Sequence, residues 1–316
     1  GGSSADVWLL GESSALAETA PAIRVTPPKP LPPPAAWAAV PLRHRPPITS
    51  RAAENLFWLG RYTERTENCT RLAQLILQSL STEEQTSMPL LTWLSRMAVD
   101  NTLVLNTVPP ATQGRRVFER TLIANLTSTN QAASVGYNLR AIKNAAATVR
   151  ERLSLEQWHV IVRAEADFFN RRNILRSHPS SHGAASQNQN QNNSVQTVYS
   201  TGQALHALEA ASSFLAAMTG AQTDRMTRDD GWRLLSIGRL IERLNTLANA
   251  LKQGFDSAAI FEESGFSAML MLFDSTITFN AQYQQRRDIA ALLDLLVMDG
   301  DNPRSLGWVV KTLRGR

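Results

Sequence analysis

Apolar and charged positions repeat with helical spacing from Ile48 to Leu80, the most regular part of the chain. At about 100° per residue, the apolar side chains cover roughly one third of the circumference, and arginines and glutamates interleave along the opposite side. Thr49 or Ser50 can cap the start, and Gly60 is the only glycine or proline in the segment. The pattern predicts one long helix with an apolar face and a charged face.

A six-residue motif of this helix occurs twice in the chain. The two copies are Gly60-Arg61-x-x-Glu64-Arg65 and Gly238-Arg239-x-x-Glu242-Arg243. Each follows a tryptophan, Trp58 or Trp232, in a segment with helical periodicity. Two copies with so long a period do not make a solenoid, so we expect two equivalent helices in one bundle.

Glycine inside a helix costs about 1 kcal/mol relative to alanine, so Gly60 and Gly238 indicate a close approach of another helix or of a ligand. If the two helices pack through these glycines, the arginines and glutamates of both motifs form one partly buried ion network. Such a network has a structural interpretation, in which paired charges fix the helix register. It also has a binding interpretation, in which arginines without a carboxylate partner hold an acidic substrate or a carrier carboxylate.

The 3.6-residue period recurs through the rest of the chain, and no stretch shows sustained strand alternation, which predicts an all-α, multi-helix bundle. Ser154 is a plausible N-cap, and Asn302 before Pro303 predicts the start of a last short helix. The other predicted helices span 88–107, 113–126, 130–153, 155–175, 198–218, 228–253, 265–283 and 286–298.

Two segments interrupt the helical pattern. Residues 21–47 hold ten of the fifteen prolines, which favours an extended polyproline II linker between modules. Residues 177–197 are polar, with an alternating glutamine and asparagine run, and are expected to form a disordered insertion because they cannot bury a core. The helical domain is therefore predicted to span 48–316.

Charge and composition exclude several classes of protein. The 32 basic and 27 acidic residues give a net charge of +5, but both signs are mixed through the helices, so nucleic-acid binding is not expected. Cys69 is the only cysteine and lies on an apolar face, which indicates a buried structural thiol and no disulfide. No apolar run reaches the ~18 residues of a membrane span, and no signal peptide is visible, so a cytoplasmic protein without membrane partners is expected.

Four segments, in order, resemble the signature of the bacterial alpha-E family of helical domains. They are Ser50-Arg51-Ala52-Ala53-Glu54-Asn55-Leu56-Phe57-Trp58-Leu59-Gly60-Arg61-Tyr62-x-Glu64-Arg65-x-Glu67-Asn68, Arg140 to Ser154, Arg228-Asp229-Asp230-Gly231-Trp232 and Asp301-Asn302-Pro303-Arg304-Ser305-Leu306. Members of this family are typically encoded beside, or fused to, circularly permuted ATP-grasp ligase modules, and often beside transglutaminase-like proteins. The resemblance implies an amide-ligation pathway without assigning this domain a reaction.

The start of the chain resembles the last strand of those ATP-grasp modules. The matching residues are Gly1-Gly2-x-Ser4-x-Asp6-Val7-Trp8-Leu9-Leu10. Residues 1–20 are thus expected to be the remnant of such a module, with an expression tag as the alternative for Gly-Gly-Ser-Ser. The expected partner is that module, fused or in trans, together with a transglutaminase-like protein. ATP and Mg²⁺ are implied only for the ATP-grasp module, and no cofactor is expected in the helical domain.

Metal and nucleophile chemistry find little support in the residues. A carboxylate-bridged metal site in a bundle requires two Glu-x-x-His pairs, and the chain has one, from Glu156 to His159. Glu64, Glu67 and Glu242 lie close to arginines that would compete for their oxygens, so no metal site is expected. His178 and His182 flank Pro179 in a polar stretch and are expected to be solvated. The chain also lacks a phosphate-binding P-loop.

The charged faces and the two terminal motifs remain as the candidate site. The candidate substrate-binding residues are Glu54, Arg61, Glu64, Arg65, Asn68, Arg228, Asp229, Arg239, Glu242, Arg243 and Arg304. The favoured function is an accessory or substrate-binding domain of an ATP-grasp-linked amide or peptide ligase system, not catalytic alone. One alternative is an enzyme that acts on the ligation product through Glu64 and Glu242. Another is a purely architectural dimerisation domain, and a homo-oligomer is compatible with each.

Overall fold

The computed structural model describes residues 47–82, 86–130, 134–176, 200–284 and 287–316. Every regular element in these ranges is helical, so the predicted all-α class is confirmed. The expected module remnant at 1–20, the linker except for its last residue, and the insertion at 177–197 lie outside the described residues. Those three predictions stay predictions.

The structure describes eleven α-helices within these ranges. They are α1 (Ser50–Ser81), α2 (Met88–Asp100), α3 (Ala111–Asn125), α4 (Val135–Thr148), α5 (Leu155–Arg176), α6 (Thr201–Asp224), α7 (Asp230–Asp256), α8 (Glu263–Leu272), α9 (Thr276–Tyr283), α10 (Ile289–Leu293) and α11 (Leu306–Arg314). Shorter turns occupy Arg150–Arg152, Ala259–Phe261 and Asp294–Met298. None of the described helices is both long and apolar enough to cross a membrane.

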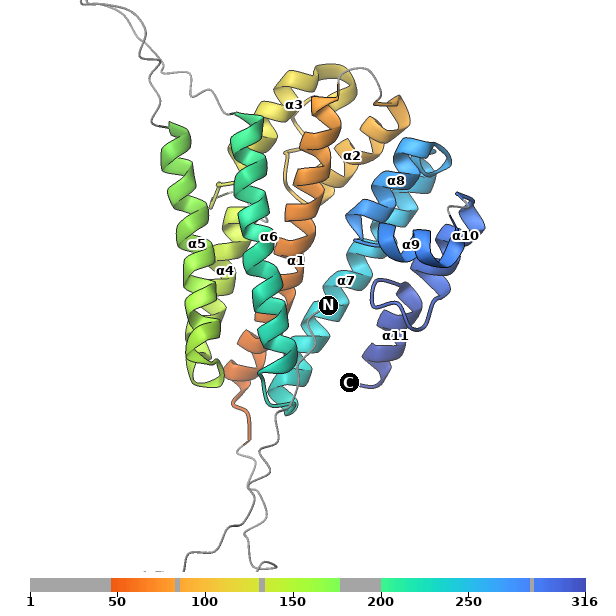
Figure 1. Ribbon diagram of the computed structural model, residues 1–316. Coiled ribbons are helices and arrows are strands. Elements are labelled where there is room, and N and C mark those ends of the chain that lie inside the picture. The colour runs from red at the N-terminus through yellow and green to blue at the C-terminus, as the bar shows by residue number, and fades with distance from the viewer. Residues whose placement is uncertain (1–46, 83–85, 131–133, 177–199, 285–286) are drawn as a thin grey trace, which may run out of the picture. The chain divides into compact units, whose positions relative to one another are not determined.

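Helix α1 is the central element of the bundle. It packs against α4 and α6 on one side and against α7, with which it makes its most extensive contact (Figure 1). Helices α1 and α7 run in the same direction, whereas α6 runs opposite to α1. Leu59, Ile76 and Leu77 of α1 are buried in the same core as Trp93 of α2. The long helix predicted from the sequence therefore supplies the core on several sides.

The backbones of α1 and α7 approach each other at Gly60 and Gly238. A Cβ at Gly60 would overlap the carbonyl oxygen of Leu235, and a Cβ at Gly238 would overlap that of Phe57. Each glycine thus contacts the backbone of the other helix. A larger residue would prevent this contact, because its Cβ would overlap the carbonyl oxygen. The sequence prediction of a close approach at both glycines is confirmed, and the approaching element is a helix.

One predicted helix ends earlier than the sequence pattern suggested. The helix expected over 88–107 ends at Asp100, because Thr102 adopts a positive φ of 51° and the chain folds back. The amides of Leu103 and Val104 both donate to the carbonyl of Ala98, which buries these apolar side chains without a helix. The prediction extended the helix to residue 107 because the apolar side chains of Leu103 and Val104 fit the helical period.

The C-terminal part is more broken than expected. The single helix predicted over 265–283 is two helices, α8 and α9, separated at Asp274, whose φ is 50°. The last helix starts at Leu306 with Ser305 as its cap, not at Asn302. The side chain of Asn302 instead donates to the carbonyl of Leu295 at 3.0 Å, which fixes the preceding loop.

Two further ranges are shorter than predicted. The helix expected over 130–153 is α4, capped by Ser134, followed by the turn at Arg150–Arg152. The helix expected over 286–298 is α10 followed by the π-helical turn. In both cases a side-chain cap, Ser134 or Asp288, sets the start that hydrophobic periodicity alone did not locate.

Replacing either contact glycine by alanine is expected to destabilise the bundle. In Gly60→Ala or Gly238→Ala the new methyl group meets a backbone carbonyl, so the helices must separate, and we expect a loss of about 2 kcal/mol or more by urea unfolding. The control is Gly220→Ala in α6, where a Cβ meets nothing within 4 Å. This control should gain up to about 1 kcal/mol in unfolding free energy from helix propensity. Equal effects at all three positions would contradict the close contact.

Candidate functional site

Each glutamate of the repeated motif is held by two arginines of the other helix. Glu64 of α1 accepts from Arg239 at 3.0 Å and from Arg243 at 2.6 Å. Glu242 of α7 accepts from Arg61 at 2.7 Å and from Arg65 at 2.7 Å. We call these six side chains the cross-paired cluster. The ion network that the sequence predicted is confirmed. Each of its four ion pairs joins α1 to α7.

The contact continues in the same register one turn further on. Asn68 lies four residues after Glu64, Thr246 lies four residues after Glu242, and the Asn68 amide donates to the Thr246 hydroxyl at 3.2 Å. Both side chains are buried. The glycines, the ion pairs and this hydrogen bond therefore join equivalent positions of the two motifs.

The arginines keep Glu64 ionised although its side chain is fully buried. Burial alone would raise the pKa of Glu64, but the positive charges of Arg243 and Arg239 outweigh it and lower the pKa from 4.5 to about 2. In return, the Glu64 charge and its hydrogen bond outweigh the burial of Arg243 and raise the pKa of that guanidinium. The carboxylate and its arginines therefore stay charged across the physiological pH range.

This geometry favours a structural role for the cross-paired cluster. Glu64 has 0% exposure and Glu242 has 5%, so neither carboxylate presents a surface to a substrate. All four motif arginines already hold a carboxylate. Removing one partner of such a buried pair leaves an uncompensated charge, which typically costs about 3–5 kcal/mol. The contacts thus fix α1 against α7. Within the cluster, no guanidinium group is without a carboxylate partner, so none is free to bind a ligand.

The remaining candidate residues lie at different places. Glu54 is exposed on the first part of α1. Asp229 is the N-cap of α7, where its carboxylate accepts from the amide of Trp232 and from Arg152 at 2.6 Å. Arg228 is exposed, with its guanidinium 5.2 Å from the centre of the Trp232 ring.

A cavity of about 410 Å³ lies beside the cross-paired cluster, between α6, α7 and α11. We call it the arginine pocket, because its charged lining consists of Arg228, Arg239, Arg243, Arg304, Arg316 and Glu67. Four of these arginines are candidates from the sequence. Arg316 and Glu67 are not among the candidates. Arg316 lies outside every motif, and Glu67 is considered from the sequence only as a metal ligand.

Positive charge is in excess in the arginine pocket. Arg239 and Arg243 hold Glu64, and Arg304 contacts Glu67 at 3.3 Å. Within the described residues, Arg228 and Arg316 contact no carboxylate. Both guanidinium groups lie against the Trp232 ring, that of Arg316 at 4.2 Å from its centre, and burial together with Arg228 lowers the pKa of Arg316. These two arginines are therefore available to an anion.

Three buried oxygen atoms of the arginine pocket's lining residues lack hydrogen-bond donors from the described part of the chain. They are Glu67 Oε2, Thr219 Oγ1 and Gln222 Oε1. A buried acceptor without a donor costs about 1–3 kcal/mol, so these atoms favour a solvent molecule or a ligand that brings N–H or O–H groups. The residues that line the pocket thus include both cations and buried acceptors without donors.

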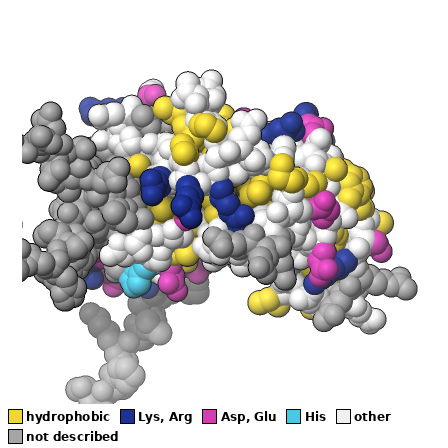
Figure 2. Space-filling view, turned by 90° about the horizontal axis from the view of Figure 1, so that it is seen from above, with side chains coloured by type: hydrophobic (Ala, Val, Ile, Leu, Met, Phe, Trp, Pro, Cys, Tyr) yellow, Lys and Arg dark blue, Asp and Glu magenta, His cyan; other side chains and the backbone are white. Residues whose placement is uncertain are grey.

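Surface cations alone do not distinguish this pocket. Figure 2 views the end of the bundle that includes α3, and Lys and Arg side chains gather there beside hydrophobic ones. Helix α3 carries Arg116 and Arg120, both exposed. The arginine pocket differs because its cations line a cavity together with buried acceptors.

Metal and thiol chemistry find no site in the described part of the chain. No group of three or more His, Cys, Asp or Glu side chains there could hold a metal ion. Burial raises the pKa of the Cys69 thiol to about 12, which keeps it protonated and unreactive. His178 and His182 lie outside the described residues.

Comparison with known proteins gives one family and a few distant relatives. The family model described as "Alpha-E: A predicted alpha-helical domain with a conserved ER motif" matches residues 48–316. The Uncharacterized protein Rv2567 of Mycobacterium tuberculosis (strain ATCC 25618 / H37Rv) is 24% identical over 285 residues, which cover 84% of this chain and 29% of the relative. The Uncharacterized protein Mb2597 of Mycobacterium bovis gives the same figures.

The chain therefore spans less than a third of the length of the curated relatives that it matches. No solved structure matches it. The Glu-Arg dipeptides Glu64-Arg65 and Glu242-Arg243 both belong to the cross-paired cluster.

Neutralising Glu64 is expected to destabilise the bundle in a pH-dependent way. Because the folded pKa is about 2 and the ordinary value is 4.5, the stabilisation is fully present above pH 4.5 and is lost as the pH falls towards 2. Glu64→Gln should lower the unfolding free energy at pH 7 by about 3 kcal/mol and flatten its slope over this window. Urea unfolding at several pH values measures both.

The matched control is Glu209→Gln on α6, because Glu209 is exposed and forms no ion pair within the described residues. Its unfolding free energy should stay within about 0.5 kcal/mol of the parent. A Glu64→Gln protein as stable as the parent at pH 7 would show that the cluster does not hold the helices together.

Proposed function

The chain belongs to the Alpha-E family of helical domains, and from that premise we propose that it is an accessory, acid-binding domain of an ATP-grasp-linked amide or peptide ligase system. The arginine pocket binds the carboxylate of an acidic substrate or of a carrier. The ligase module, fused or in trans, supplies ATP and Mg²⁺ and performs the chemistry. The cross-paired cluster keeps α7 fixed on α1, so that the pocket has a constant shape.

The observation that carries this proposal is the pair of arginines without carboxylate partners. Arg228 and Arg316 lie on the same tryptophan ring and line one cavity with Arg304. A guanidinium group presents planar, fixed donors that match a carboxylate, and hydrogen bonds between two charged groups are stronger than those between neutral groups. An acidic ligand would relieve the repulsion among these cations.

The relatives support an accessory role in a larger assembly. The chain aligns with only 29% of the Mycobacterium tuberculosis protein, so the helical domain there is one part of a longer polypeptide. The resemblance of residues 1–10 to the end of an ATP-grasp module supports that module as the partner.

The enzymatic alternative has less support from the geometry. A catalytic Glu64 would have to reach a substrate, but its side chain is fully buried under two arginines. The low pKa of Glu64 also makes it a weak general base and leaves it deprotonated, so it cannot act as an acid at neutral pH. The architectural alternative is a dimerisation domain, and the cluster does not favour it, because its ion pairs join two helices of one chain.

Removing the two available arginines is expected to abolish acid binding without unfolding the chain. We expect triglutamate to quench the fluorescence of the pocket tryptophans in the parent protein, with an affinity that falls as salt rises. Arg228→Ala combined with Arg316→Ala should weaken binding at least tenfold, because two charge-assisted contacts are lost.

Arg116→Ala is the matched control, since Arg116 is an exposed arginine on α3 outside the pocket. Its affinity for triglutamate should equal that of the parent. Equal affinity in the parent and the double variant would show that the arginine pocket does not bind acids.

The ligase link predicts that product formation depends on this domain. With the co-encoded ATP-grasp module, ATP and an amino-acid and peptide pool, adding the chain should raise the ATP-dependent yield or change the product seen by mass spectrometry. The Arg228→Ala and Arg316→Ala double variant should fail to do so. A ligase module that forms the same product at the same rate alone would contradict an accessory role in ligation.

A further inference from the structure

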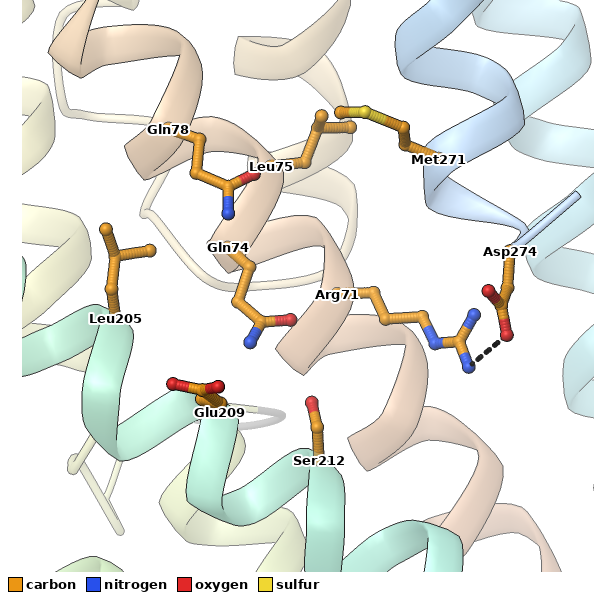
Figure 3. Close-up of a pocket in the computed structure, with 9 residues that line it drawn as sticks. All are labelled: Arg71, Gln74, Leu75, Gln78, Leu205, Glu209, Ser212, Met271 and Asp274. Carbon is orange, nitrogen blue, oxygen red and sulfur yellow. Dashed lines mark hydrogen bonds and ion pairs between the residues drawn. The ribbon is translucent and has the colours of Figure 1, made fainter. Parts of the chain in front are cut away.

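A second cavity, of about 530 Å³, lies further along α1 and α6. Figure 3 shows Gln74 and Gln78 pointing from α1 towards α6, which contributes Glu209 and Ser212 from the facing side. Arg71 points the other way, to an ion pair with Asp274 at 3.3 Å. We call this cavity the polar pocket, because amide, hydroxyl and carboxylate groups face its centre.

The polar pocket carries the opposite charge to the arginine pocket. Arg71 is engaged by Glu67 at 3.0 Å and by Asp274, so its charge is compensated. Glu209 is exposed and contacts no cation within the described residues. The uncompensated charge is thus one carboxylate, which favours an ammonium group.

One face of α6 connects the two pockets. Six of its residues fall within about 80° of the helix circumference. They are Leu205, Glu209 and Ser212 of the polar pocket, Thr219 and Thr223 of the arginine pocket, and Ala216 between them. Ala216 is small and exposed, so no large side chain of α6 interrupts the face.

Helix α1 connects the pockets in the same way from the other side. Glu67 lines the arginine pocket, and Arg71, Gln74 and Gln78 line the polar pocket. These four lie within about 60° of the circumference of α1. Because α1 and α6 are antiparallel neighbours, the two pockets lie one after the other along their contact. We call the two pockets, with the faces of α1 and α6 between them, the groove. The ion pair of Glu67 with Arg71 joins a lining residue of the arginine pocket to a lining residue of the polar pocket.

The length of the groove sets the size of its ligand. From Glu209 to Thr223 the helix rises about 21 Å at ~1.5 Å per residue. An extended peptide covers that length with about six residues at ~3.3 Å each. A single amino acid or a small diacid spans one pocket only.

The polar groups set its chemistry. The arginines of the arginine pocket favour an anion such as a carboxylate, and the acceptors on Glu67, Thr219 and Gln222 favour a ligand with N–H or O–H groups. A peptide main chain brings several N–H groups and a carboxylate together, whereas a fully deprotonated phosphomonoester group brings no donor. Glu209, at the far end, matches a free amine.

We propose that the groove between α1 and α6 binds an extended peptide of about six residues, with its acidic carboxyl end in the arginine pocket and its free amine at Glu209. This inference rests on the proposed function, because the acidic end uses the same arginines. It adds the class of ligand, its length and its direction. Gln74 and Gln78, one turn apart, then face the peptide main chain with amide donors and acceptors.

The test compares three synthetic ligands on the whole chain by titration calorimetry. They are the dipeptide Glu-Glu, the hexapeptide Ala-Ala-Ala-Ala-Glu-Glu and the same hexapeptide with an acetylated amine. The free hexapeptide should bind at least tenfold more tightly than the dipeptide, and acetylation should weaken the binding of the hexapeptide. In Glu209→Gln the free and acetylated hexapeptides should bind equally, since the amine and Glu209 act as one pair.

The outcomes separate the two proposals. If the dipeptide and both hexapeptides bind with one affinity that still falls in the Arg228→Ala and Arg316→Ala double variant, the extended groove is wrong and the arginine pocket stands. If none of the three ligands binds, both proposals fall. Acetylation changes only the ligand, so the test does not depend on how well the Glu209→Gln variant folds.

Discussion

The contact between α1 and α7 is the constraint on which the rest of the structure depends. Two glycines bring the helix backbones together, and that proximity places Glu64 and Glu242 within reach of the arginines of the opposite helix. A buried carboxylate with two arginine partners is stable only while both helices keep their register. Since α1 also packs against α4 and α6, the register of α7 is set relative to the rest of the core.

That same contact creates the charge distribution that a ligand would meet. The cluster uses four arginines and two glutamates, which leaves two net positive charges on its surface. The guanidinium of Arg243 also donates to the carbonyl of Pro303 at 3.1 Å, so the loop that leads into α11 is tied to α7. Arg304 and Arg316 reach the pocket from this C-terminal segment. The cross-paired cluster and the arginine pocket thus have Arg239 and Arg243 in common.

The sequence predicted the elements that depend on local pattern. The length of α1, the caps at Thr49 and Ser154, the glycine contact and the ion network all follow from spacing and repetition. It did not predict the break at Asp274, because a non-glycine residue with positive φ leaves no signal in hydrophobic periodicity. Nor could it predict that Arg316 meets Arg228 on one tryptophan ring, since tertiary packing alone brings those residues together.

The central claim is that the cross-paired cluster is structural and that the arginines beside it bind acidic ligands. A crystal structure of the chain with the acidic hexapeptide tests this most directly. We expect Glu64 to keep both Arg239 and Arg243, with the carboxyl end of the peptide on Arg228 and Arg316. A ligand carboxylate that displaces Glu64 or Glu242 from its arginines would contradict the account, because the cluster would then be the binding site.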